Sequence, residues 1–257
     1  MKVVSLASGS KGNAYCVTSG GRMLLIDCGL SCRELCARAA SAGLSLDAID
    51  GVVFTHSHDD HAKGVKSFHK KFADVPLFAN MMTAEAIAWR FGVDEVDFVP
   101  FENGQTFFVG EFEVLPFSIP HDTSDPVGYL VRADGETYFH GTDIGTPLDS
   151  IGFHLAEADY ATLESNHDTE LLFRSGRPVS LIQRIAGPRG HLSNDQAADL
   201  VRRFASPRLR SLALAHLSEQ CNAPHLAMSA MSCALAEMGR SDVALTVLSQ
   251  DACVGVC

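Results

Sequence analysis

The chain has 257 residues, of which 46% are hydrophobic, so it is long and apolar enough to bury the core of a globular protein. Its 31 acidic residues outnumber its 20 basic ones, and the net charge of -11 excludes a whole-protein basic field that gathers nucleic acid non-specifically. No run approaches the roughly 20 apolar residues of a membrane span, and MKVVSLASGSKGN lacks the apolar region of a signal peptide, so we expect no membrane partner.

The first half reads as short strands broken by turns, with strands expected at 1–8, 14–20 and 21–29 as an antiparallel meander. A helix is expected at about 31–43, where Ser31 caps the start, Glu34 completes a capping box and Gly43 closes the end. Further along, the pattern predicts elements in the following order: a buried strand at 48–56, a helix at about 60–73, a strand at 76–80, a helix at 81–92 and hairpin strands within 98–121.

The second half shows the same alternation of strands and helices, with different spacing. Strands are expected near 127–133, 137–143, 159–164, 211–216 and 243–248, and helices near 147–157, 193–205 and 225–240. The helix at 193 has its own start signal, because Ser193 followed by Gln196 forms a second capping box. Two strand-rich halves with helices between them predict an α/β fold: a four-layered αββα sandwich of two mixed sheets, forming a single domain over 1–257.

Eight cysteines lie within apolar strand-like and helix-like stretches rather than at the spacings of a disulfide framework. Cys28, Cys32 and Cys36 recur every four residues, which is the spacing of an ordinary buried helical face. We therefore expect free thiols and a cytoplasmic location.

The strongest chemical signal is the segment THSHDDH at 55–61, which directly follows an apolar strand. His56 and His58, two apart on extended backbone, point the same way and can bind one ion. Asp60 and His61, where the chain turns into a helix, can face a second ion. Three imidazoles and two carboxylates within six residues predict a metal site.

Further candidates each follow a strand-like run: His121, Asp143, His191 and His216. A single histidine or aspartate in such a loop is often merely exposed or hydrogen-bonded, but together with the upstream cluster these side chains favour metal binding. Ions such as Zn²⁺ and Mn²⁺ need several nitrogen and oxygen ligands, and one carboxylate can hold two metals within about 4 Å. Asp143 is the candidate for that bridge.

The sequence resembles the metallo-β-lactamase superfamily, whose HxHxDH motif is present at 56–61, and the resemblance covers nearly the whole chain. Within it, the chain resembles the WalJ/YycJ group of bacterial nucleases through several words: ASGSKGN at 7–13, IDCGLS at 26–31, THSHDDH at 55–61, PHDTSDPVGY at 120–129, TDIG at 142–145, LESNHD at 163–168, GHLSN at 190–194 and AHLSEQCN at 215–222. Cys221 departs from the polar residue expected of that group, so its role stays open.

The resemblance implies two divalent metal ions per chain, Zn or Mn first, with Fe, Co or Mg as alternatives. It places His56, His58 and His121 on one metal, Asp60, His61 and His216 on the other, and Asp143 between them. A water or hydroxide between the ions, acidified by the metal charge, would attack phosphorus in line.

The resemblance also suggests residues that act beside the metals. Asp60, His191 and Glu164 are expected at the catalytic centre, with His191 as general acid or phosphate clamp. Glu164, Asn166 and His167 could also orient the ligating imidazoles, or form a simple turn. Contacts with substrate are expected from the Gly-Ser loop, which could equally be a hairpin turn, and from the later words: Ser8, Ser10, Asn13, Asn166, His167, His191, Ser193 and Asn194.

The expected function is metal-dependent cleavage of phosphodiester bonds, by a DNA exonuclease or a related phosphodiesterase. Only 48 residues separate Asp143 from His191, too few for the extra domain with which RNase J-like nucleases clamp RNA, so a DNA end or a small phosphodiester fits better. A thioester or lactam hydrolase of the same fold, glyoxalase II-like or β-lactamase-like, is the alternative; a regulatory scaffold is a third. Cationic groups at the cleft would favour phosphodiesters: Lys11, Lys63, Lys66, Arg184 and Arg189. The oligomeric state is left open.

Overall fold

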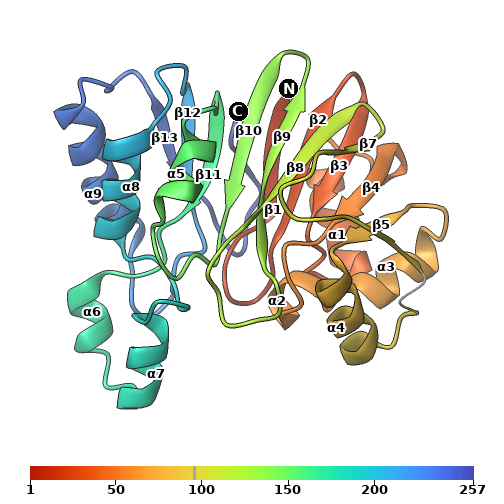
Figure 1. Ribbon diagram of the computed structural model, residues 1–257, viewed down its shortest axis with the longest axis horizontal. Coiled ribbons are helices and arrows are strands. Elements are labelled where there is room, and N and C mark those ends of the chain that lie inside the picture. Colours follow the sequence, from red (N-terminus) through yellow and green to blue (C-terminus); the bar gives the residue numbers. More distant parts are fainter. Residues whose placement is uncertain (95–96) are drawn as a thin grey trace.

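The computed structural model describes residues 1–94 and 97–257, and in this part the strands form two seven-stranded sheets (Figure 1). The first sheet has the order β14 (Val254–Gly255), β1 (Lys2–Ala7), β2 (Ala14–Ser19), β3 (Arg22–Ile26), β4 (Ile49–Val53), β5 (Leu77–Ala79), β6 (Phe98–Pro100). The second has the order β13 (Ala244–Val247), β12 (Ser211–Ala215), β11 (Tyr160–Glu164), β10 (Glu136–Gly141), β9 (Val127–Ala133), β8 (Phe112–Ser118), β7 (Phe107–Val109).

Both sheets are mixed and are built in the same way. β1, β2 and β3 pair antiparallel, and β3 to β6 then run parallel. In the second sheet β7 to β10 pair antiparallel, and β10 to β13 run parallel. This confirms the predicted pair of mixed sheets. The short strand β14, which sequence reasoning missed, adds an antiparallel edge beside β1.

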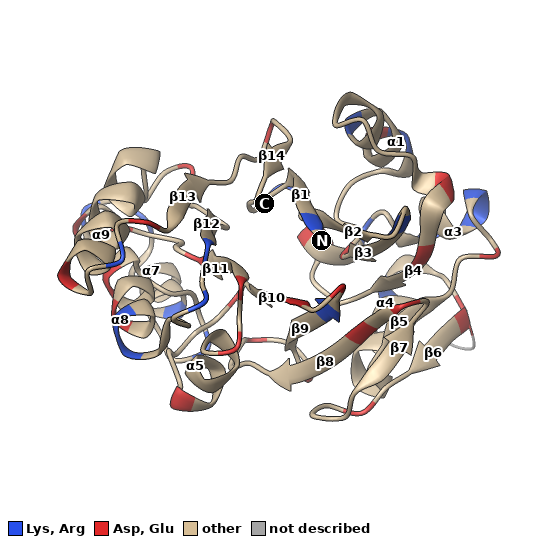
Figure 2. Cartoon of the chain, turned by 90° about the horizontal axis from the view of Figure 1, so that it is seen from above, with Lys and Arg blue, Asp and Glu red and all other residues tan. Residues whose placement is uncertain are grey.

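Helices cover the outer face of each sheet, which gives the four predicted layers (Figure 2). The first sheet carries α1 (Cys32–Ser41), α3 (Val65–Lys71) and α4 (Met81–Phe91), and the second carries α5 (Asp149–Leu155), α8 (Asn194–Phe204) and α9 (Pro224–Glu237). Short helices lie in the loops: η1 (Leu46–Ala48), α2 (Asp59–Ala62), α6 (Thr169–Phe173) and α7 (Val179–Ile185). Between the sheets, a third apolar cluster joins Leu24 of the first to Val114 and Tyr138 of the second.

Three local expectations were wrong. The helix expected at about 60–73 breaks at Gly64, because the Gly64 amide donates to the Cys28 carbonyl oxygen at 2.8 Å and the Asp60 carbonyl oxygen accepts from Asn13 at 2.7 Å. Only glycine fits there, since an added Cβ would lie 1.8 Å from the Leu30 carbonyl oxygen. Ser31 accepts from the Glu34 amide at 3.3 Å, but the Glu34 carboxylate binds Arg38 at 2.6 Å instead of closing the capping box. The helices α6 and α7 were missed because each is short and they are separated by Gly176 and Pro178.

The second predicted capping box is confirmed, because Ser193 and Gln196 satisfy each other's amides at the start of α8. Among the described helices, none is long and apolar enough to cross a membrane.

Candidate metal centre

The predicted ligands meet at one edge of the sandwich, where strands of both sheets end. The loop after β4 carries His56 and His58, and α2 follows with Asp60 and His61. From the second sheet, single residues follow three different strands: His121 after β8, Asp143 after β10 and His216 after β12. Carboxyl ends of strands are where open α/β sheets place their sites, so the fold assembles these side chains from distant parts of the sequence.

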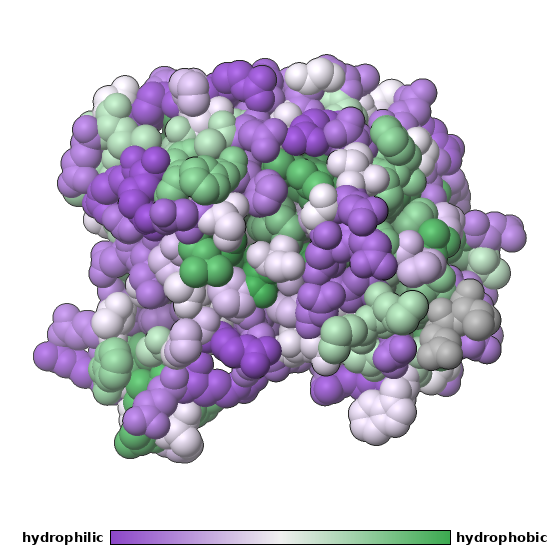
Figure 3. Space-filling view, in the orientation of Figure 1, coloured by the Kyte–Doolittle hydropathy of each residue, from purple (hydrophilic) through white to green (hydrophobic). Residues whose placement is uncertain are grey.

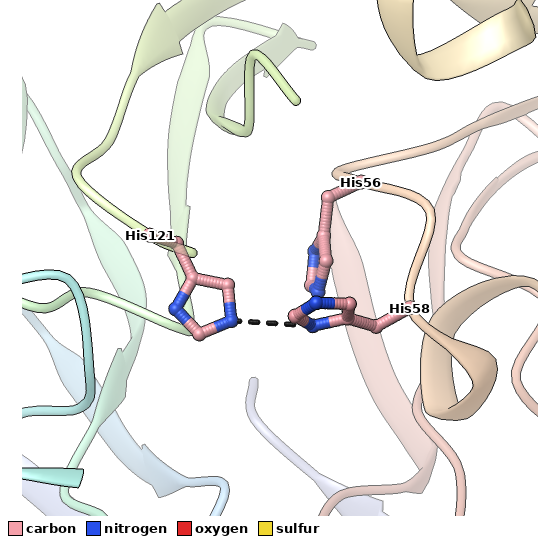
Figure 4. Close-up of side chains that lie close together, drawn as sticks. All are labelled: His56, His58 and His121. Carbon is pink, nitrogen blue, oxygen red and sulfur yellow. Dashed lines mark hydrogen bonds between the residues drawn. The ribbon is translucent and has the colours of Figure 1, made fainter. Parts of the chain in front are cut away.

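One group consists of His56, His58 and His121, whose nearest ring nitrogens all lie within 4.8 Å of one another. Figure 4 shows the rings converging from two sides, with 3.3 Å between His121 Nε2 and His58 Nδ1. His121 Nδ1 lies 3.0 Å from the Gly190 carbonyl oxygen, which can only accept, so this nitrogen carries the proton and Nε2 is left to bind an ion. We call this group the outer position because His58 is only half-buried.

The second group, the inner position, consists of Asp60, His61 and His216, again with ligand atoms within 4.8 Å. Carboxylates stand behind both imidazoles. Asp27 Oδ2 lies 2.7 Å from His61 Nδ1, and Glu164 Oε1 lies 3.3 Å from His216 Nδ1. Burial alone would lower the pKa of His216, but Asp143, Asp60 and Glu164 raise it to about 10. The inner position therefore has an excess of negative charge that a divalent cation can balance.

Asp143 lies between the two positions. Its ligand atom groups with those of His56 and His61 within 4.8 Å, and its Oδ1 lies 3.7 Å from His121 Nε2. Burial would raise the pKa of Asp143, but His216, His61 and His56 lower it well below the ordinary value, so the carboxylate is charged. This is the location expected of a bridging ligand.

Two ligand atoms show that these residues fit a metal. His56 Nε2 is buried without a hydrogen-bond partner in the described part of the chain, and buried Asp143 Oδ2 faces the His61 imidazole at 3.2 Å without a well-formed hydrogen bond. A buried polar atom is costly without a partner, and here both atoms lie among other nitrogen and oxygen ligands. The donor set, imidazole and carboxylate, suits divalent ions of the zinc and manganese type.

The backbone at the site is strained. Asp27, Asp143 and His216 each follow a strand and adopt positive φ angles of 62°, 60° and 57°. Such left-handed conformations are unfavourable for residues other than glycine and cluster at functional sites. Gly29 allows another close approach, since a Cβ there would lie 1.8 Å from the Asp60 carbonyl oxygen. This contact explains the glycine of the IDCGLS word.

His191 and Glu164 form a pair beside the ligands. His191 Nδ1 lies 2.8 Å from Glu164 Oε1 and 3.6 Å from Asp143 Oδ1. The other Glu164 oxygen accepts from the amides of Ile144 and Leu192, at 2.8 and 3.0 Å, so the carboxylate is fixed. Burial would raise the pKa of Glu164, but His191 lowers it to about 2. Burial lowers the pKa of His191, but the Glu164 charge raises it overall, so its imidazole holds a proton more tightly.

Asn13 and Ser8, expected to contact substrate, instead hold the ligand loops. The side-chain nitrogen of Asn13, Nδ2, lies 3.0 Å from His61 Nε2 and 3.3 Å from the Asp60 carbonyl oxygen. Ser8 Oγ accepts from the His216 amide at 2.9 Å, and the Ser8 amide donates to Ser249. The backbone amides of Ser8 and Asn13 are thus engaged within the chain. Ser10 is exposed.

The later substrate candidates also have internal partners. Asn166 Nδ2 donates to the His216 carbonyl oxygen at 2.8 Å, so it supports a ligand loop, as the orienting role predicted. Ser193 caps α8, where its Oγ accepts from the Gln196 amide, and Asn194 exchanges hydrogen bonds with Asn222. His167 is buried, and its Nδ1 lacks a partner among the residues described.

The cationic candidates differ from one another. Lys11 Nζ lies 2.5 Å from the Glu219 carboxylate. Lys63 Nζ donates to the Lys11 carbonyl oxygen, also at 2.5 Å. Arg184 and Arg189 lie beside His121: Arg189 Nε donates to the His121 carbonyl oxygen at 2.9 Å. Lys66 lies on α3.

Sequence reasoning missed Asp122. Its Oδ1 lies 3.5 Å from His121 Nε2 and 3.7 Å from His58 Nε2, at the outer position. Its Oδ2 lies 2.5 Å from Arg184 Nε. The signal available was a carboxylate directly after a predicted ligand in PHDTSDPVGY.

Comparisons with known proteins agree with this geometry. A family model described as "Beta-lactamase superfamily domain" matches residues 22–216. The chain is 32% identical to Exodeoxyribonuclease WalJ of Streptococcus pneumoniae, over 90% of this chain and 87% of that protein. It is 33% identical to Exodeoxyribonuclease YycJ of Bacillus anthracis, over 91% of this chain and 89% of that one. The metallo-β-lactamase fold protein YhfI of Bacillus subtilis has a similar structure, with a TM-score of 0.71, 15% identity and 99% of both chains covered.

Proposed function

Because this chain belongs to the metallo-β-lactamase superfamily, and within it to the family of WalJ and YycJ, we propose that it is a two-metal hydrolase that cuts phosphodiester bonds. The proposed substrate is DNA, cut from an end, because both relatives are named exodeoxyribonucleases and cover nearly the whole chain. Zn²⁺ or Mn²⁺ are the proposed ions, with Fe, Co or Mg as alternatives that metal analysis would distinguish.

The observation that carries the proposal is the pair of His191 and Glu164 next to the ligand cluster. Cleaving a phosphodiester releases an alkoxide, which is a poor leaving group unless a proton reaches it. His191 Nδ1 bonds Glu164 at 2.8 Å, which leaves Nε2 to present a proton. The carboxylate raises the pKa of this imidazole against the effect of burial, which favours the protonated form. His191 Nδ1 lies 3.6 Å from Asp143 Oδ1, so the ring that would donate this proton lies beside the candidate metal ligands.

Other residues of the chain have positioning roles in this proposal. His56, His58 and His121 would hold one ion, Asp60, His61 and His216 the other, and Asp143 both. When bound, the ions supply Lewis-acid charge that acidifies water and offsets negative charge on the phosphate. Asp27 fixes the His61 ring, and Glu164 fixes both His191 and His216. Asp60 Oδ2 lies 3.3 Å from His216 Nε2, and its negative charge keeps that face of the site anionic.

We also propose that the chain works as a single domain in a reducing compartment, as the cytoplasm is. The apolar cluster between the sheets draws on both halves of the sequence, which favours one folding unit. All eight cysteines carry free thiols, as expected where disulfides do not form.

The test compares four substrates: labelled duplex DNA, bis(p-nitrophenyl) phosphate, a thioester and a β-lactam. Each is incubated with protein loaded separately with Zn²⁺, Mn²⁺, Co²⁺ or Mg²⁺. We expect shortening of the DNA from its ends and hydrolysis of the phosphate reporter. Turnover of only the thioester or the lactam would move the assignment to the alternative hydrolase. No turnover of any substrate with any ion would favour the regulatory scaffold.

A further inference from the structure

The helices α6 and α7 and the turns around them, residues 168–190, form an arm that projects beyond the sandwich (Figure 1). The arm has a small apolar core of its own, in which Leu172 and Ile182 pack against Cys221. The Cys221 carbonyl oxygen also accepts from the Asp168 amide at 2.8 Å. Cys221 therefore anchors the arm, which gives a structural reason for an apolar residue at this position.

The outer surface of the arm combines exposed apolar side chains with arginines. Phe173 and Val179 are 61% and 68% exposed, and Figure 3 shows hydrophobic surface on this lobe next to hydrophilic surface. The arm, residues 168–190, contains four arginines and two acidic residues, Asp168 and Glu170, although the whole chain has a net charge of -11. The Arg174 side chain is 77% exposed and bonds Glu170 at 2.6 Å, an exposed ion pair that contributes little and exchanges easily.

The arm is joined directly to the candidate metal centre. Arg184 of α7 bonds Asp122, the carboxylate beside His121, and Arg189 donates to the carbonyl oxygens of His121 and Thr123. The chain then continues through Gly190, which accepts from His121, to His191. A ligand that extends from the candidate metal centre on this side would pass Arg184 and Arg189. Further along the arm, Arg174 is exposed and Arg177 donates to Gln220 Oε1 at 3.0 Å.

We propose that the arm binds the strand of nucleic acid that extends beyond the bond being cut, an inference that rests on the proposed function. Phosphates carry one negative charge per nucleotide and would bind Arg174 and Arg177, while a base would stack on Phe173. This combination of cations and an exposed aromatic ring is how single strands are held without sequence preference. It supplies the local basic surface that an acidic protein needs to hold nucleic acid.

The experiment separates binding at the arm from chemistry at the metals. The holoenzyme is assayed on a single-stranded oligonucleotide of about 12 nucleotides and on bis(p-nitrophenyl) phosphate, which is too small to reach the arm. The test variants are Phe173→Ala and the double variant Arg174→Glu with Arg177→Glu. The matched control carries Arg22→Glu and Arg210→Glu, the same charge change at exposed residues that begin or precede β3 and β12, at the opposite strand ends.

With the oligonucleotide, we expect the double arginine variant to lower kcat/KM at least tenfold, chiefly through a higher KM. The slope of log kcat/KM against log salt should become shallower by about 0.7 for each phosphate that the arm no longer binds. Phe173→Ala should lower kcat/KM roughly tenfold. The control variant and the cleavage of the small phosphate by all variants should stay within about twofold of the unchanged protein.

Two outcomes would overturn the inference while leaving the proposed function intact. One is cleavage of the oligonucleotide at unchanged kcat/KM by both arm variants. The other is an equal loss on both substrates, with melting temperatures preserved, since it would mean that the arm acts only on the metal centre. If an arm variant melts early, the milder Arg174→Gln variant replaces it. If the unchanged protein cleaves the small phosphate but no nucleic acid, the proposed DNA substrate fails first and the inference fails with it.

Discussion

The outer and inner positions of the candidate metal centre differ in the groups that contact the second ring nitrogen of their histidines, the one that does not face the ion site. At the inner position, carboxylates of Asp27 and Glu164 lie against His61 and His216. At the outer position, His121 Nδ1 donates to the Gly190 carbonyl oxygen, and the Thr55 hydroxyl lies 3.0 Å from His56 Nδ1. Carboxylates behind a ligating histidine strengthen metal binding more than neutral groups do, because they make the imidazole a better donor.

The exposure of the histidine ligands differs in the same direction. Among the histidine ligands only His58, at the outer position, is partly open to solvent; at the inner position both imidazoles are buried and the Asp60 carboxylate is the partly open ligand. We infer a division of labour in which the inner position holds its ion permanently and the outer position admits substrate oxygens. The following experiments can break or refine this comparison.

The largest effect is expected at Asp143, which lies between both positions. Asp143→Asn keeps a side chain that tolerates the left-handed backbone but removes the charge. We expect phosphodiester cleavage to fall to background and the metal content to drop at both positions, as measured by elemental analysis. His61→Ala should also abolish cleavage, with loss of the inner ion. Full activity in Asp143→Asn would show that this carboxylate does not join the two positions.

His191→Ala should lower kcat about 100-fold to 10,000-fold, the usual contribution of a general acid, because the leaving alkoxide loses its proton donor. Both ions should remain bound, since His191 belongs to neither position as we define them. Elemental analysis of the same sample checks this. Loss of an ion would instead make His191 a ligand together with Asp143, Glu164 and His216, a group whose ligand atoms also lie within 4.8 Å.

The pH dependence of cleavage also tests His191 as the general acid. Glu164 raises the pKa of His191, and the acid form of His191 is the active one, so cleavage should decline as pH rises through that pKa. Glu164→Gln removes the negative charge, so the pKa of His191 falls and the alkaline limb of the profile should move to lower pH. The measurement is kcat/KM against pH with the small phosphate. An unmoved limb would assign it to another group.

Asp27→Asn should weaken the inner ion about tenfold to 100-fold and the outer ion less, because His61 loses its carboxylate, whereas His56 reaches Asp27 only through the Thr55 hydroxyl. Titration of the metal-free protein, with two resolved affinities, measures this. The matched control is Asp134→Asn, the same change at another left-handed residue, in the turn between β9 and β10. Equal weakening at both positions would contradict the comparison.

The smallest effect concerns the order of metal release. A chelator added in increasing amounts should remove the outer ion first, giving protein with about one ion per chain before the inner ion leaves. Release of both ions in one step would mean that the positions do not differ as their surroundings suggest.

The sequence revealed the two halves of this site unequally. His56, His58, Asp60 and His61 stand within six residues, so their chemistry was visible locally. From the second sheet, His121, Asp143 and His216 come singly from three strands, and only the strand ends and the family resemblance pointed to them. The two mixed sheets followed from alternating hydrophobicity, which is a strong local signal.

Other features depended on tertiary contacts that no local pattern records. The helix breaks at Gly64 because its amide donates to the Cys28 carbonyl oxygen, which lies 36 positions earlier in the sequence. Asp122 looked like an ordinary loop residue until Arg184 and His58 were placed beside it. Ser8 and Asn13 read as a phosphate loop because the sequence does not show that their amides donate to Ser249 and Asp60, or that Ser8 Oγ accepts from the His216 amide.

The left-handed backbone at Asp143 and His216 narrows the choices open to directed evolution of this centre. Only glycine, asparagine, aspartate and histidine adopt that conformation readily, and other side chains cost about 1–3 kcal/mol there. His58, by contrast, has φ -66° and ψ 154°, an extended conformation that any residue adopts. A library that seeks a thiolate-rich centre for softer ions should therefore randomise His58 and spare the two left-handed ligands.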